Sequence, residues 1–162
     1  GVDGERNYYI LEIDRFKTDK NSEYFKRIFK LYEKWGFTKI RAEITAAQKT
    51  IVTDLKESYI RPLGLSLSVD EYRPPNRMGA KEERIMATLQ PKYENHQIWH
   101  YRGGNCQALE EELLFANPAH DDIKDALASA IDFAVAPLDL FRMKKQETTS
   151  LYNFHSKYGG TL

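Results

Sequence analysis

The residues best suited to metal chemistry are carboxylates that gather near the end of the chain. Asp121, Asp122 and Asp125 follow His120 where the pattern predicts the start of a helix, and spacings of three and four residues place them on a shared helix face. Carboxylate oxygens of this kind suit Mg²⁺ and similar hard cations. The alternative interpretation is structural, because acidic side chains at a helix start cap free N–H groups and favour the helix dipole.

Glu43 is a second candidate for metal binding. It stands near the end of the predicted strand 38–44, and sites in open α/β sheets form beyond the carboxyl ends of strands. The plain alternative is a solvent-facing strand position, since side chains alternate along a strand and Glu43 points away from Ile44.

Four cations are candidates for phosphate binding. Lys81 and Arg84 follow a proline-rich loop that carries Arg73 and Arg77, and such side chains contact the backbone of nucleic acids. The alternative is a solvated helix face with weak ion pairs to neighbouring glutamates.

The elements that must position these residues alternate along the chain. A turn at residues 3–7 leads into a strand, and helices and strands then follow one another. Asn21 and Ser22 are predicted to cap the first helix, and Gly36 to end it. Strands are predicted at 8–13, 38–44, 65–69 and 97–101, and helices at 21–35, 46–59, 80–89, 107–114 and 121–135. This order predicts an α/β fold with a mixed sheet of about five strands, an antiparallel opening hairpin, and helices on both faces. Strand 65–69 should lie parallel to strand 38–44, because a helix joins them.

Composition fits one domain at residues 1–143, followed by a polar C-terminal tail at 144–162. The 162 residues include 24 basic and 24 acidic side chains, so no basic excess favours tight non-specific DNA binding. No apolar run is long enough to span a bilayer, which predicts no membrane partner. Cys106 is the single cysteine, so we expect a buried thiol and a reducing compartment. No G-x-x-x-x-G-K-[S/T] motif occurs, which argues against ATP hydrolysis by a P-loop.

Three segments, taken in order, resemble the nuclease domain of the terminase large subunit of tailed bacteriophages. The first segment, Ile40-Arg41-Ala42-Glu43 with Gln48, is similar to the family's second acidic motif. The second, Gly79 to Ile85 with Leu89 and Pro91, is similar to its lysine–arginine segment. The third, His120 to Ala128, is similar to its last acidic motif. The likeness runs from about Val2 to Phe133.

The resemblance implies a ribonuclease H-like fold and a two-metal endonuclease that cuts concatemeric viral DNA during genome packaging. Two Mg²⁺ or Mn²⁺ ions, roughly 3.5–4 Å apart, would serve phosphodiester hydrolysis. Glu43, Asp121 and Asp122 would be catalytic, and Asp125 would join them as a metal ligand. Lys81, Arg84, Arg77 and Arg73 would bind double-stranded DNA. Implied partners are the terminase ATPase domain, the small terminase subunit and the portal protein, in the host cell cytoplasm.

The chain departs from this family at its beginning. The family carries a first catalytic aspartate on a strand upstream of a hairpin like residues 1–13, and Asp3, Glu12 and Asp14 are poor substitutes for it. We therefore expect the domain to be incomplete at its N-terminus and to cleave DNA poorly as it stands. Two other functions stay open: another ribonuclease H-like nuclease of resolvase or transposase type, or a non-catalytic module that grips DNA or docks a partner.

Overall fold

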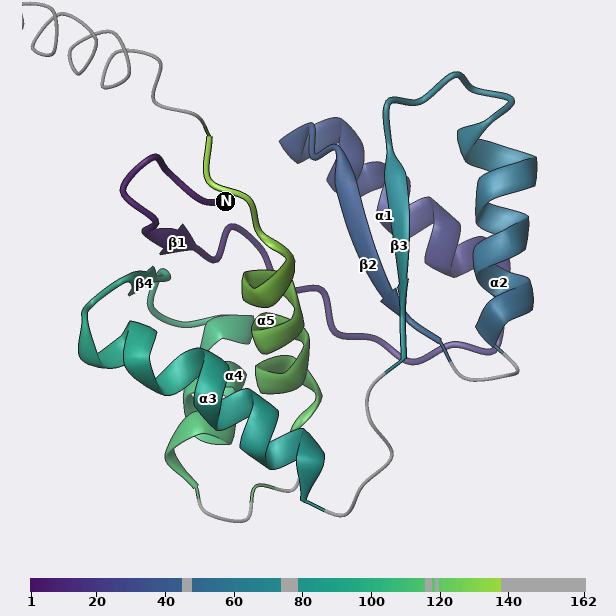
Figure 1. Ribbon diagram of the computed structural model, residues 1–162. Helices are drawn as coiled ribbons and strands as arrows, with labels where there is room; N and C mark the ends of the chain where they lie inside the picture. The colour runs from purple at the N-terminus through teal and green to yellow at the C-terminus, as the bar shows by residue number, and fades with distance from the viewer. Residues whose placement is uncertain (45–47, 74–78, 116–117, 119, 138–162) are drawn as a thin grey trace, which may run out of the picture.

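The described part of the chain folds into five α-helices, a short π-helix and two small parallel sheets (Figure 1). The computed structural model describes residues 1–44, 48–73, 79–115, 118 and 120–137. In order, the elements are β1 (Tyr8–Tyr9), α1 (Asn21–Trp35), β2 (Lys39–Glu43), α2 (Gln48–Asp54), the π-helix η1 (Leu55–Ile60), β3 (Ser68–Tyr72), α3 (Ala80–Glu94), β4 (Ile98–Trp99), α4 (Asn105–Leu114) and α5 (Asp122–Phe133). An α/β fold is therefore confirmed. None of the described helices is both long and apolar enough to cross a membrane.

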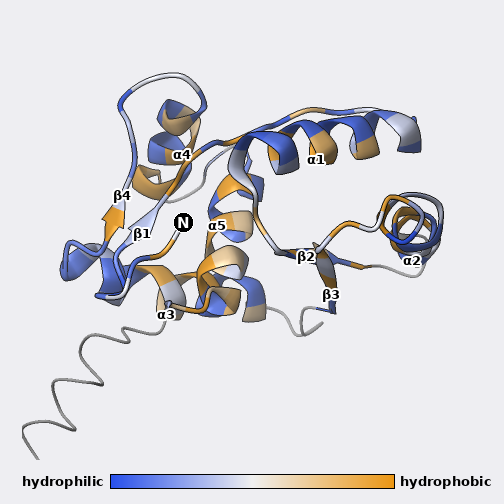
Figure 2. Ribbon diagram, turned by 90° about the horizontal axis from the view of Figure 1, so that it is seen from above, coloured by the Kyte–Doolittle hydropathy of each residue, from blue (hydrophilic) through white to orange (hydrophobic). Residues whose placement is uncertain are grey.

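The β2–β3 sheet has helices on both faces. The two strands pair in parallel, with Ile40 opposite Val69 and Arg41 opposite Asp70. Ile40 and Val69 pack against a cluster built from Phe25, Leu55, Ile60 and Leu67, so that face is covered by α1, η1 and the segment before β3. Arg41 points to the other face, where it reaches α5. Helices α2 and α5 accordingly lie on opposite sides of the two strands (Figure 2).

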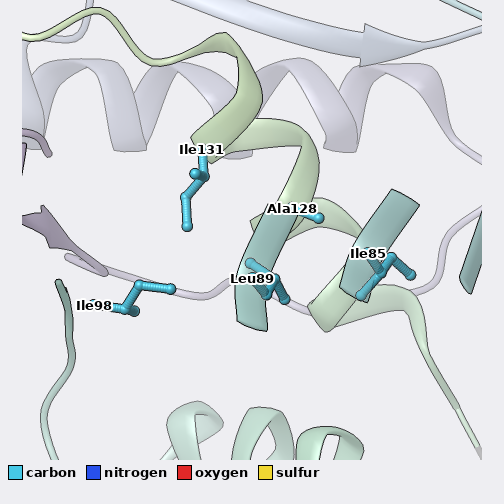
Figure 3. Close-up of a cluster of buried hydrophobic side chains, with 5 residues drawn as sticks. All are labelled: Ile85, Leu89, Ile98, Ala128 and Ile131. Carbon is cyan, nitrogen blue, oxygen red and sulfur yellow. The ribbon is translucent and has the colours of Figure 1, made fainter. Parts of the chain in front are cut away.

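A second core lies where α3, α5 and the β1–β4 sheet meet. Its buried members, shown in Figure 3, come from three elements: Ile85, Leu89, Ile98, Ala128 and Ile131. Tyr8 and Ile10 pack against them, which buries one face of the β1–β4 pair. Cys106, at the start of α4, is fully buried as expected. This core fixes α3 against α5, the two helices that carry most of the candidate site.

Helix α1 agrees closely with its prediction because several local signals coincide. Apolar residues recur at helical spacing, and Gly36 adopts the left-handed conformation that ends the helix, with φ of 61°. Gly36 donates its backbone N–H to the Tyr32 carbonyl at 2.8 Å. The predicted caps are wrong, since the helix begins at Asn21 and the N-cap residue, Lys20, makes no side-chain cap bond.

The single mixed sheet is the main correction. The described strands form two separate pairs, β1–β4 and β2–β3, both parallel. The opening hairpin amounts to one antiparallel bridge, between Val2 and Tyr8. The paired part of β1 is only Tyr8 and Tyr9. The Asp3 carboxylate stabilises the turn before it by accepting bonds from Glu5, Asn7 and Tyr9.

Several element boundaries also differ from the predicted ones. The strand predicted at 65–69 lies at Ser68–Tyr72, because the backbone N–H groups of Leu65 and Leu67 bond to the nearby carbonyls of Ile60 and Leu65 and not to β2. It does run parallel to β2, as expected. Helix α3 was predicted to end at Leu89, but it continues for five more residues to Glu94, with Pro91 inside the helix. The proposed tail at 144–162 lies outside the described residues.

Candidate functional site

The lysine–arginine segment and the last acidic segment meet directly in the structure. Lys81 Nζ lies 2.9 Å from Asp121 Oδ2 and 3.2 Å from Asp125 Oδ2. Arg84 forms an ion pair with Asp125 and donates to Ser129 Oγ at 3.1 Å. Lys81 and Arg84 are one turn apart on α3 and face the start of α5, where Asp121 and Asp125 are also one turn apart. Two segments separated by about forty residues thus form one cluster, which we call the ion-pair cluster (Lys81, Arg84, Asp121 and Asp125).

The contact between Lys81 and Asp121 shifts the pKa of both groups. A hydrogen bond from Lys81 lowers the pKa of Asp121 below its usual range. For Lys81, partial burial acts to lower the pKa, but the bonds to Asp121 and Asp125 outweigh it and the pKa is raised. Both groups are therefore charged at neutral pH. Two cations meet two carboxylates, so the ion-pair cluster has no net charge.

Buried Glu112 of α4 caps α5, a role that sequence reasoning missed. Its Oε2 accepts bonds from the backbone N–H groups of Ile123 and Lys124, each at 2.9 Å. Asp121 occupies the N-cap position without a side-chain cap bond. The capping interpretation of the aspartates therefore does not describe Asp121. A signal for Glu112 was present, because it stands three residues after fully buried Leu109 on the apolar side of α4.

Glu43 lies at the end of β2, on the face that α5 covers. It is two residues from Arg41, so both side chains leave the same side of the strand. Its register partner is Tyr72, whose ring lies 5.6 Å from the Arg84 guanidinium. Glu43 is thus connected to the ion-pair cluster through Tyr72 and Arg84, and its direct approach to the aspartates stays a prediction.

The other candidates lie outside the cluster. The Asp122 residue is exposed, and its side chain makes no hydrogen bond or ion pair with the described part of the chain. Arg73 is exposed just after β3, near enough to Glu71 to help lower the pKa of that carboxyl, after the larger effect of Lys56. Arg77 lies outside the described residues.

The arrangement does not fit a metal ion as it stands. Glu43, Asp121, Asp122 and Asp125 offer the oxygen atoms that Mg²⁺ or Mn²⁺ prefers. Yet within residues 1–44, 48–73, 79–115, 118 and 120–137 no group of three or more His, Cys, Asp or Glu side chains is placed to hold a metal ion. Two of the four candidate carboxylates are instead bound to cations of α3. Chemically, the cluster can hold α3 against α5, or exchange its internal ion pairs for external ones.

Comparisons with protein-family models, with curated proteins and with solved structures found no match to this chain.

Proposed function

We propose that the chain is a terminase-type nuclease domain, a metal-dependent endonuclease that cuts concatemeric viral DNA during packaging. The observation that carries the proposal is the contact between Lys81 and Asp121 at 2.9 Å. Two of the three segments on which the resemblance rests, far apart in sequence, are neighbours in space, as parts of one site would be. The third, with Glu43, ends on the same side of β2 as that site.

In this proposal Glu43, Asp121, Asp122 and Asp125 are the metal-binding carboxylates, and Lys81, Arg84, Arg73 and Arg77 hold the phosphates of double-stranded DNA. The bound cations, Mg²⁺ or Mn²⁺, would supply the activated water and charge stabilisation of phosphodiester hydrolysis. Because the side chains are not arranged around a metal ion, we assign no catalytic step to them. The proposed fold is ribonuclease H-like. A terminase ATPase domain, small subunit and portal protein are the proposed partners.

The test is cleavage of linear duplex DNA by the chain alone and by a form that includes any residues encoded upstream of Gly1. We expect little cutting by the chain alone and Mg²⁺- or Mn²⁺-dependent cutting, stopped by chelator, by the longer form. In the longer form Glu43→Ala and Asp121→Ala should each abolish cutting while the circular dichroism spectrum is unchanged. The matched control is Glu33→Ala, which removes an exposed carboxylate of α1. Undiminished cutting by a Glu43→Ala/Asp121→Ala double variant would disprove these assignments. A preference for branched over linear DNA would favour a resolvase-type nuclease instead.

A non-catalytic DNA-gripping or docking module is the second candidate. The balanced ion-pair cluster favours it, because carboxylates bound by Lys81 and Arg84 act as a brace between helices. Duplex binding without cleavage in either form, with any divalent cation, would support this alternative.

A further inference from the structure

Two separate buried cores divide the described elements into two groups. One core is built by α3, α5 and β4, and the other by α1, η1 and the segment before β3. The cores share no residue, and the partly buried side chains packed against each core belong to its own group. Figure 1 shows the two groups beside each other, as an α3–α5 lobe (β1, α3, β4, α4 and α5) and a β2–β3 lobe (α1, β2, α2, η1 and β3). Each lobe thus has its own core and roughly sixty residues, a size at which many domains fold alone.

Helix α5 meets the β2–β3 sheet through charged, polar and aromatic groups. Ser129, Asp132 and Phe133 share one face of α5, because they are three and four residues apart. Arg41 of β2 donates to the Asp132 carboxylate at 2.6 Å and to the Ser129 carbonyl at 3.5 Å. Its guanidinium also lies 4.8 Å from the Phe133 ring, and the ammonium of Lys39 lies 5.9 Å from the same ring. These contacts between helix and sheet therefore depend on two basic side chains of β2.

Two further contacts between the lobes are polar as well. The Arg84 guanidinium of α3 lies 5.6 Å from the Tyr72 ring of β3. On the connection from β1 to α1, the Ile13 carbonyl accepts a bond from Asn105 of α4 at 2.6 Å. Within the described residues, each hydrogen bond, ion pair and ring contact that joins α3 or α5 to the sheet involves an arginine or a lysine. Such contacts add little stability where a partner is in solvent, and the Asp132 side chain is 58% exposed.

We propose that the two lobes separate as units at the contact between α5 and the β2–β3 sheet, and that the Arg41–Asp132 pair is the main contact holding them together. Polar contacts between the parts of a chain commonly permit relative motion. Salt screens the pair but leaves the two apolar cores intact, so ionic strength shifts the balance toward the open form. The Arg41 and Arg84 side chains are each 17% exposed in the closed form. Opening exposes both guanidinium groups to solvent and to anionic ligands. The inference does not depend on the proposed nuclease function.

The experiment measures the distance between two spin labels, one on each lobe, by pulsed electron paramagnetic resonance. Thr50→Cys on α2 and Ala87→Cys on α3 place the labels at exposed positions, while the native Cys106 is fully buried. In about 0.1 M salt we expect one main distance, and in about 1 M salt a second distance whose population grows. A second pair of labels, Ala87→Cys with Arg102→Cys, lies within the α3–α5 lobe and should keep its distance throughout.

Two aspartate variants separate the contact between lobes from a general loss of charge. Asp132→Asn removes the partner of Arg41 on α5, and it should raise the population of the second distance about two- to fivefold at low salt. Asp70→Asn is the matched control, because it removes the other carboxylate bound to Arg41, which lies in the same lobe as Arg41. This control should leave the distances of the original chain unchanged.

Three outcomes would overturn the inference. A single, unchanged distance between the lobes in every variant and at both salt concentrations would show that the lobes do not separate. Equal effects of Asp132→Asn and Asp70→Asn would show that the Arg41–Asp132 pair does not hold them together. Broadening of both label pairs together would indicate general unfolding in place of separation into two intact lobes.

Discussion

At the scale of single residues, Glu112 carries the largest predicted effect on stability. One oxygen of this buried carboxylate accepts hydrogen bonds from two backbone N–H groups at the start of α5. Glu112→Ala would leave both groups buried without an acceptor, so we expect the free energy of unfolding to fall by about 2–3 kcal/mol in urea titrations. The neighbouring exposed residue provides the control, since Glu111→Ala should cost no more than about 0.5 kcal/mol. Similar losses for both variants would refute the capping role.

The pair Lys81–Asp121 predicts how stability depends on pH. The folded pKa of Asp121 is lowered, chiefly by its bond from Lys81, so the ionised form stabilises the fold above the usual pKa near 3.8. That contribution is lost as pH falls through the lower, folded pKa. We expect urea titrations of Asp121→Asn to show a smaller loss of stability than the original chain as the pH falls below about 4. An unchanged acid dependence would mean that the pair does not hold in solution.

Residue identities were easier to predict than residue partners. Lys81, Arg84, Asp121 and Asp125 were all expected to matter, but their mutual neutralisation depends on how α3 packs against α5. That packing is set by Ile85, Leu89, Ala128 and Ile131, and no spacing within either helix encodes it. The capping role of Glu112 was missed for a related reason. An acidic residue on the apolar face of α4 makes sense only once the start of α5 is known to lie against it.

At the scale of elements, Arg41 joins the β2–β3 sheet to α5. It donates to Asp70 of β3 at 2.8 Å and to Asp132 of α5 at 2.6 Å, and it stacks on Phe133 at 4.8 Å. Its side chain is 17% exposed, while both acidic partners are partly in solvent. We expect Arg41→Met to lower the free energy of unfolding by about 1–2 kcal/mol and to speed amide exchange in β2. The same change at Arg61, 75% exposed and paired only with Glu57 in the described chain, should cost less than about 0.5 kcal/mol. Equal losses of stability in the two variants would show that Arg41 does not link the β2–β3 sheet to α5.

Element prediction succeeded where the signal was local and failed where pairing decided the outcome. Periodic apolar residues and Gly36 defined α1 from sequence alone. The start of β3 was misplaced because Leu65 and Leu67 read as strand residues, yet their side chains fill the core beneath the sheet. The prediction of a single sheet of about five strands was wrong for a different reason. Alternating apolar residues indicate that strands exist, but they do not show which strands pair with each other.

At the scale of the whole molecule, the balance of charges should govern the proposed binding of DNA. The chain has 24 basic and 24 acidic residues, and the ion-pair cluster binds two candidate DNA-contacting cations, Lys81 and Arg84, internally. Without divalent cations we therefore expect weak duplex binding with a shallow salt dependence. Asp121→Asn/Asp125→Asn should release both cations. The slope of log K against log salt should then steepen by up to about two, or roughly 0.9 for each freed cation that meets a phosphate.

The control must change net charge equally without freeing those cations. Glu33→Gln/Glu94→Gln removes two exposed carboxylates, from α1 and from the far end of α3. If net charge alone governs binding, both double variants will gain affinity alike, and the cluster has no special role. If released cations govern it, only the aspartate variant will show the steeper slope in titrations across a salt series. Adding Lys81→Ala to that variant should then remove about one unit of slope, because the phosphate contact belongs to that side chain.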